Sequence, residues 1–240
     1  MLTLIAAARR KPGMTHRAFL HHLHHVHGPL SAANPLRIRR YVQNHVFDAS
    51  FGTEEDPAHL TEFGRDSVTE LRFDDMEALA ATMSDPYVRE VIAPDGARFS
   101  DLPSALALLT RTEVLMPPPA SAGDAAPVKV LHFVHAAQGL GQDDVVGRWR
   151  AAHEQVLAEA VRGCVQHRRV PEDGRALRHF GAEDEPPYAG VTALYYDSEN
   201  EALTHFPAYE RALRERSDET GGFYDPSRSF VLYGREVTIF

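Results

Sequence analysis

The sequence has little cysteine and no long apolar run. Cys164 is its single cysteine among 240 residues. Without a disulfide framework of the secreted kind, a reducing, cytoplasmic location is expected. No apolar run approaches the roughly 20 residues of a membrane-spanning helix. The apolar run Leu2–Ala8 precedes Arg9 and Arg10, the reverse of the order in a secretory signal, and it predicts a strand.

Positive charge is also scarce. Lys and Arg number 25 against 34 Asp and Glu, which gives a net charge of −9. Binding to a phosphate backbone depends on cationic side chains, so we expect no nucleic-acid partner. The sequence also lacks a glycine-rich phosphate loop and a nucleotide fingerprint. The partner we expect is a small molecule.

One stretch rich in proline and small residues interrupts the chain near its middle. It cannot sustain a helix or pair well in a sheet, so it predicts a linker over 117–127 between a first domain, 1–116, and a second, 128–240.

Both halves are predicted to have the same order of elements. In the first half, Thr15 is placed to cap a helix with an apolar stripe, and Pro29 predicts a kink or break of that helix near His27 and Gly28. The strands expected there are Leu2–Ala8, Ile38–Phe47, Ser67–Phe73 and Leu106–Leu115, with a second helix from Met76 to about Met83. In the second half we expect strands Val128–His135, Cys164–Val170, Gly190–Asp197 and Phe230–Phe240, and helices Asp143–Ala160 and Glu199 to about Arg216.

This order is βαββαβ twice, typical of ferredoxin-like units. Residue matches support a duplication: Phe19 and His27 correspond to Val145 and His153 at one constant shift. The predicted fold class is therefore α+β, with two tandem ferredoxin-like repeats packed sheet to sheet as an intramolecular barrel.

Several short motifs resemble the EthD family of the dimeric α+β barrel group. They are Arg10-Lys-Pro-Gly-Met-Thr15, Phe19-x3-Leu23-x3-His27-Gly-Pro-Leu30, Tyr41-Val-Gln-Asn-His45, Pro186-Pro-Tyr-Ala-Gly-Val191, Tyr196-Asp-Ser198 and Asp225-Pro-Ser-Arg-Ser229. The resemblance implies two sheets that close around a pocket, here within one chain, with a further homodimer also allowed. It also implies a range of chemistries: cofactor-free cyclases and monooxygenases, decarboxylases, dehydratases and haem-binding branches.

Strand alternation suggests which residues face that pocket. If Val42 and Val46 face the helices, then Tyr41, Gln43 and His45 face the barrel interior; likewise Glu70 and Arg72 would point inward from the third strand. The matching inward positions in the second half include Cys164, Gln166, Arg168, Ala193 and Tyr195.

These positions provide a candidate acid/base site. His27 or His45 with Glu70 could act on an enolisable carbonyl, and Tyr41 could donate to the developing enolate oxygen. The alternative is structural: His27 caps its helix and Glu70 pairs with Arg72 or Arg111. Gln43, Arg72, Trp149, His153, Gln166 and Tyr195 are the candidate substrate-binding residues. Core packing is the alternative for Trp149.

The histidine-rich run between His21 and His27 spaces two histidines one helical turn apart. It lacks a clear third ligand, so we expect solvent-facing histidines and no metal site. No cofactor is expected; haem has no support in the residues. The prediction is a cofactor-independent acid/base enzyme, a cyclase, dehydratase or decarboxylase, acting on an apolar oxygenated molecule. The alternatives are a dioxygen-using monooxygenase and a non-catalytic protein that binds a hydrophobic ligand.

Overall fold

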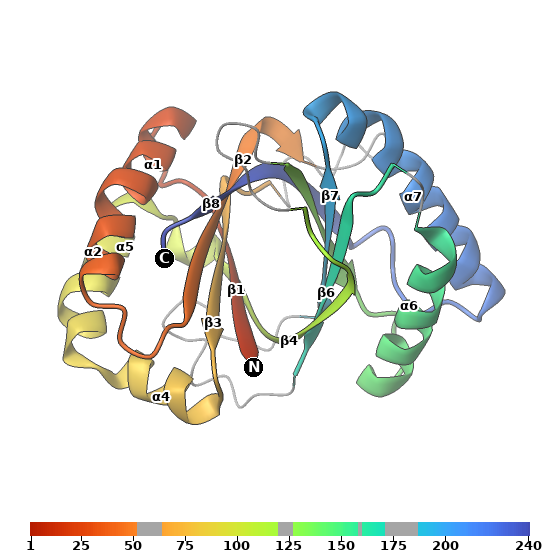
Figure 1. The fold of residues 1–240 in the computed structure, drawn as a ribbon, viewed down its shortest axis with the longest axis horizontal. Helices are drawn as coiled ribbons and strands as arrows, with labels where there is room; N and C mark the ends of the chain where they lie inside the picture. The colour runs from red at the N-terminus through yellow and green to blue at the C-terminus, as the bar shows by residue number, and fades with distance from the viewer. Residues whose placement is uncertain (52–63, 120–126, 158–159, 171–186) are drawn as a thin grey trace.

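The computed structural model describes residues 1–51, 64–119, 127–157, 160–170 and 187–240. A central barrel of eight strands has a layer of helices on each side (Figure 1). The first half contains β1 (Leu2–Ala8), α1 (His16–His22), η1 (Leu23–His27), α2 (Gly28–Ala33), β2 (Arg40–Phe51), β3 (Ser67–Phe73), α4 (Met76–Ser84), η2 (Val88–Ile92), α5 (Ala93–Phe99), η3 (Leu102–Ser104) and β4 (Leu106–Met116). The second half contains β5 (Val128–His135), α6 (Gln142–Val156), β6 (Gly163–Arg169), β7 (Tyr188–Tyr196), α7 (Glu199–Glu219) and β8 (Phe230–Thr238).

The barrel is closed and antiparallel, in the strand order β1-β3-β2-β8-β5-β7-β6-β4. Each half contributes four neighbouring strands, and the halves join where β2 pairs with β8 and β4 pairs with β6. The two halves therefore share one hydrogen-bonded sheet. Closure leaves no unpaired edge strand in the barrel.

The predicted order of strands and helices is confirmed within the described residues. Thr15 caps α1 as expected, because its hydroxyl accepts a hydrogen bond from the Ala18 N–H at 3.1 Å. Asp75 caps α4 and Ser198 caps α7 in the same way. The helical segments η2 and α5 between Val88 and Phe99 were not predicted.

The expected distortion near His27 is present as a π-helical turn. Over Leu23–His27 the helix widens, and the Gly28 N–H bonds to the Leu23 carbonyl. The helix then continues through Gly28–Ala33, with Pro29 in its first turn, where the missing N–H is tolerated. The turn Val88–Ile92 has the same form, and Pro94 follows it. Such π-turns are frequent at functional sites.

For two strands, the prediction of which side chains point into the barrel is wrong by one residue. In β2 the inward residues are Asn44 and Val46, while Tyr41, Gln43 and His45 face the helices. In β6 the inward residues are Val165 and His167, while Cys164 and Gln166 face the helices. Both faces of these strands are buried, so the valine pattern could not fix the facing. The inward facing predicted for Glu70 and Tyr195 is confirmed.

The core has three layers. An apolar cluster of Ile5, Val68, Phe133, Phe230 and Leu232 with their neighbours fills one part of the barrel interior. A second cluster packs the first helix layer against its strands through Leu4, Leu71, Phe73 and Leu79. The third, around Trp149, Phe206 and Tyr209, does the same in the second half.

Among the described residues, no helix is long and apolar enough to cross a membrane.

Candidate functional site

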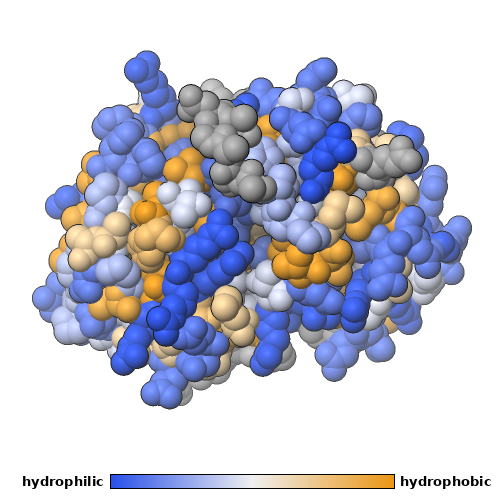
Figure 2. All heavy atoms as spheres, viewed as in Figure 1, coloured by the Kyte–Doolittle hydropathy of each residue, from blue (hydrophilic) through white to orange (hydrophobic). Residues whose placement is uncertain are grey.

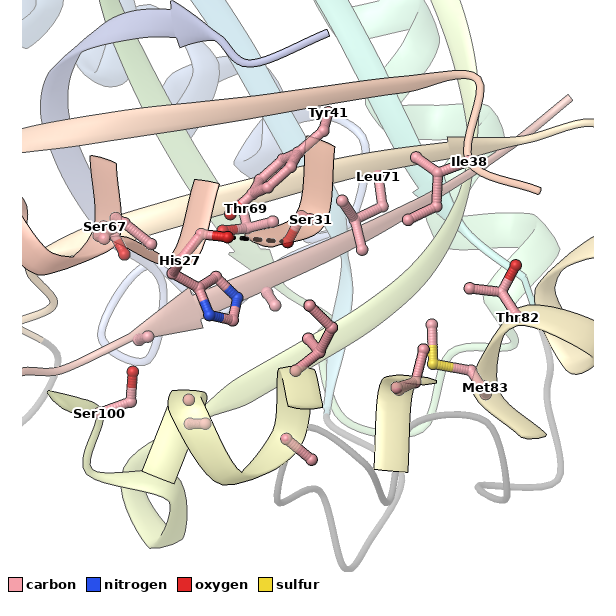
Figure 3. Close-up of a pocket in the computed structure, with 18 of the residues that line it drawn as sticks. His27, Ser31, Ile38, Tyr41, Ser67, Thr69, Leu71, Thr82, Met83 and Ser100 are labelled. Carbon is pink, nitrogen blue, oxygen red and sulfur yellow. Dashed lines mark hydrogen bonds between the residues drawn. The ribbon is translucent and has the colours of Figure 1, made fainter. Parts of the chain in front are cut away.

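An apolar cavity of about 150 Å³ lies between the sheet and the helices of the first half (Figure 3). Its floor is formed by short side chains of the sheet, among them Ala6, Ala8 and Thr69, which leave room above them. Its other walls come from the helical segments that carry His27, Ser31, Met83, Ile92 and Phe99. Both π-helical turns contribute to these walls. This cavity lies outside the barrel, whereas the predicted pocket lies inside it.

His27 lines this cavity, and Asp95 lies behind it as its hydrogen-bond partner. The His27 Nδ1 lies 3.0 Å from one Asp95 carboxylate oxygen, and the His22 Nε2 lies 3.0 Å from the other. Asp95 is only 3% exposed, so its carboxylate is held in place within the protein. Ser31 fixes the backbone at this point, because its hydroxyl donates to the His27 carbonyl at 3.0 Å. Figure 3 shows the His27 ring extending towards α5, with Tyr41 and Thr69 on the sheet.

This geometry sets the state of the His27 ring. Burial lowers the pKa of His27 below its ordinary value, against the opposing hydrogen bond and charge of Asp95. Burial raises the pKa of Asp95, but hydrogen bonds from His27 and His22 outweigh it and keep that pKa below its ordinary value. A carboxylate only accepts hydrogen bonds, so Nδ1 carries the proton of the neutral ring. Nε2 is then left with the lone pair of a general base.

Tyr41 is the second titratable group on the cavity wall. Its hydroxyl accepts a hydrogen bond from the Gln43 amide at 3.0 Å and also interacts with Thr69. Burial raises the pKa of Tyr41 to about 12, so the phenol keeps its proton at neutral pH. The same Gln43 amide donates to the Leu23 carbonyl at 2.9 Å, which ties the strand to the π-turn. Tyr41 is therefore a positioned hydrogen-bond donor.

The predicted partnership of these histidines with Glu70 does not form. Glu70 points into the barrel, where it pairs with Lys129, on the opposite face of the sheet from His27. His45 faces the helices but does not line the cavity; its Nε2 bonds to Gln43 at 2.9 Å and its ring contacts His24. Burial lowers the pKa of His45 to about 4, and the nearby His24 contributes a smaller electrostatic effect in the same direction. The structure supplies Asp95 where Glu70 was expected.

The corresponding region of the second half is bonded internally. His153, the counterpart of His27, is fully buried; its Nδ1 lies 3.0 Å from the Trp149 carbonyl. Its Nε2 contacts the Tyr209 hydroxyl at 2.6 Å and the Thr192 hydroxyl at 3.1 Å. No lone pair of the ring is left for a substrate. Trp149, His153 and Gln166, predicted to bind substrate, thus contribute to the packing and hydrogen bonding of the helix layer.

Asp95 is the functional residue that the sequence did not reveal. No element was predicted between the helix that ends near Met83 and the strand that begins at Leu106. Val88, Ile92 and Phe99, spaced four and seven residues apart, were the available signal of an apolar helix face.

Neither nucleophilic catalysis by cysteine nor metal binding is supported in the described residues. Burial raises the pKa of Cys164 to about 12, which disfavours the thiolate that a nucleophile needs. Within the described ranges, no group of three or more His, Cys, Asp or Glu side chains is arranged to hold a metal ion.

Comparison with known proteins supplies the family. The profile of the EthD domain matches twice, over residues 11–103 and 137–227. No curated protein matches the chain. Among solved structures, an anthrone oxidase-like protein superposes with a TM-score of 0.60 at 10% identity, covering 99% of this chain and 92% of that chain.

Two other solved structures share the fold at a similarly low sequence identity. A protein described as a monooxygenase candidate from Lactobacillus acidophilus has a TM-score of 0.51 at 11% identity, over 100% of this chain and 94% of its own. A mutant chlorite dismutase from Candidatus Nitrospira defluvii, in complex with cyanide, has a TM-score of 0.51 at 10% identity, over 99% and 91%. At these identities the likeness concerns the fold alone.

Proposed function

We propose, from the premise that this chain belongs to the EthD family, that its first half is a cofactor-independent acid/base catalyst for an apolar, oxygenated small molecule. The observation that carries the proposal is His27 on the wall of an apolar cavity, with its Nδ1 held by the buried Asp95. A buried base oriented by a carboxylate is the arrangement that proton abstraction requires.

The first step is the transfer of a proton from carbon to nitrogen. His27 Nε2 takes a proton from the carbon next to a substrate carbonyl; the C–H bond breaks, and its electron pair moves into the enolate. The imidazolium formed is stabilised by Asp95, which keeps its hydrogen bond to Nδ1. The developing oxyanion receives a hydrogen bond from Tyr41, whose raised pKa keeps the phenol protonated. Reprotonation, elimination of water or ring closure can each follow from the enolate. Loss of carbon dioxide from a β-keto acid would instead form the enolate directly, since the electron pair of the broken C–C bond moves into it, and His27 would then act only in the reprotonation.

The size of the cavity limits the substrate. The cavity has a volume of about 150 Å³. In another protein, an apolar cavity of about this volume accommodates benzene. A single aromatic or alicyclic ring therefore fits, and a larger polycyclic molecule would extend through the opening. The apolar walls select against charged substrates, because a charge would lose its hydration without gaining a partner.

Oxidation is the second candidate. Structures described as anthrone oxidase-like and as a monooxygenase candidate share the fold, and a carbanion formed by His27 could be oxidised by dioxygen. Oxygen uptake that depends on His27 would favour this reaction over the lyase-type reactions. The remaining alternative, a protein that only sequesters a hydrophobic ligand, predicts tight binding without turnover.

The test is hydrogen exchange at carbon with acetophenone, a single-ring ketone, as the probe. In deuterated water the enzyme should accelerate exchange of the methyl protons, measured by proton NMR. The variant His27→Gln should lose the acceleration by about 10²- to 10⁴-fold, the contribution of general base catalysis. His25→Ala is the matched control, because His25 is exposed on the same helical turn and does not line the cavity. Equal exchange in wild type and His27→Gln would refute the role of His27.

The tandem arrangement belongs to the same proposal. Each half is a ferredoxin-like unit, and the second unit takes the place of a partner subunit, so one chain suffices for the barrel. No haem or metal takes part. A Soret band in the purified protein would contradict the cofactor-free mechanism.

A further inference from the structure

A second cavity, of about 360 Å³, lies at one mouth of the barrel. Residues from both halves line it: Arg40, Glu70 and Arg72 from the first, and His167, Tyr195 and Glu236 from the second. It is separated from the helix–sheet cavity by the sheet, since adjacent residues Glu70 and Leu71 face opposite cavities. Strongly hydrophilic residues also lie across the middle of the face in Figure 2, in front of the barrel.

The carboxylates of this cavity are already paired. Lys129, 1% exposed, forms ion pairs with Glu70 and with Glu236, the latter at 3.1 Å. Arg40 pairs with Glu236 at 2.7 Å. Three cations, Lys129, Arg40 and Arg72, stand against two carboxylates, so the charge of the cluster is 3 − 2 = +1.

Arg72 carries the unbalanced charge. Its guanidinium has no hydrogen bond or ion pair among the described residues, yet Arg72 lines the cavity. Its cross-strand partner is Arg40, and like charges directly opposite each other destabilise a sheet. An anion beside Arg72 would remove this repulsion.

Neutral donors lie near the same cavity. Burial lowers the pKa of His167 to about 4, so the ring is neutral at pH 7. Its Nδ1 contacts the Thr112 hydroxyl at 3.1 Å, and its Nε2 has no hydrogen-bond partner in the described part of the chain. The phenol of Tyr195, whose pKa burial raises to about 12, keeps its proton and donates a hydrogen bond to Glu236 at 3.4 Å.

We propose that the barrel-mouth cavity binds a small organic monocarboxylate, held by Arg72 with help from the His167 ring. Arginine offers a planar fork that matches a carboxylate with two parallel hydrogen bonds. A dianion is disfavoured, because Glu70 and Glu236 line the same space. Val114, Val165 and Pro118 give the cavity an apolar side that suits the carbon skeleton of an organic acid rather than an inorganic ion. This site is independent of the reaction proposed for the first half.

The experiment uses the full chain and three probes: benzoate, its neutral isostere benzamide, and inorganic phosphate. Binding is measured by calorimetry and by the concentration dependence of the melting temperature. Benzoate should bind saturably, and both benzamide and phosphate more weakly. Arg72→Gln should weaken benzoate at least about tenfold, since a hydrogen bond to a charged group contributes on this scale. Arg111→Gln removes the same charge from β4, which is separated from β3 by β1 and does not place Arg111 in the cavity, and should bind like wild type.

Stability separates a ligand-binding role from a structural one. Without ligand, Arg72→Gln should melt at or above the wild-type temperature, because the repulsion from Arg40 is removed. Arg72→Lys keeps the charge but loses the fork and should bind benzoate with intermediate strength. Equal benzoate binding by Arg72→Gln and wild type would overturn the site, and equal binding of phosphate and benzoate would overturn the ligand class. Neither result bears on the acetophenone exchange.

Discussion

Replacing Lys129 with methionine should destabilise the protein strongly at neutral pH. The ammonium group is buried between Glu70 and Glu236, so its removal leaves a buried carboxylate without its cation. Breaking a buried pair from one side costs about 3–5 kcal/mol. Asn44 still donates to Glu70 at 2.9 Å, which keeps the cost within this range.

The pKa of Glu70 gives an independent magnitude. Burial raises this pKa, but the charge of Lys129 and the hydrogen bonds to Lys129 and Asn44 outweigh it and lower it to about 2. Relative to the ordinary 4.5, this difference corresponds to about 3 kcal/mol of folding stability. Because the folded-state pKa is lowered, the contribution is complete above about pH 4.5 and is lost as the pH falls towards 2.

The assay is urea denaturation followed by circular dichroism at pH 7 and pH 3. In Lys129→Met, burial still raises the pKa of Glu70 while the opposing cation is gone and the Asn44 hydrogen bond remains, so the carboxyl accepts a proton more readily as the pH falls. The stability difference from wild type should therefore shrink from about 3–5 kcal/mol at pH 7 to a smaller value at pH 3. The double variant Glu70→Gln with Lys129→Met should recover part of the loss at pH 7. A penalty that is the same at both pH values would refute the electrostatic account and indicate lost packing only.

Two further predictions concern packing. Leu23→Trp introduces into the first half the residue that the second half has at Trp149; it should abolish probe binding in the helix–sheet cavity, measured by calorimetry, with benzoate binding at the barrel mouth as the control. Gly190→Ala should destabilise the fold by several kcal/mol, because a Cβ there would lie 2.0 Å from the His167 carbonyl oxygen and the backbone φ is +155°. Gly147→Ala, which has open space around its Cβ, is the control, and a matching urea midpoint for the two variants would contradict the prediction.

The repeat and the barrel could be predicted from the sequence because their signals are local and recur. Thr15 before an apolar stripe, Asp75 before Met76 and Ser198 before Glu199 are helix starts whose chemistry does not depend on the rest of the fold. The residue matches at a constant spacing then gave the duplication, and the family profile matches both halves.

The site could be predicted only in part. His27 and Tyr41 line the helix–sheet cavity, but the partner of His27 is Asp95, which lies 68 residues away in a segment where no element was predicted. The prediction of which β2 side chains point into the barrel failed because Val42 and Val46 are buried inside the barrel while Tyr41 is buried under the helices. When both faces of a strand are buried, apolar alternation no longer distinguishes them.

A barrel made from one polypeptide need not be symmetric. In an assembly of two identical subunits, every substitution appears twice, so a large ring that closes one pocket would close the other as well. Here Leu23 leaves space beside His27, while Trp149 occupies the matching position beside His153. Substitutions in one half can thus favour catalysis while substitutions in the other favour stability. Because the halves are one polypeptide, they do not dissociate at low protein concentration.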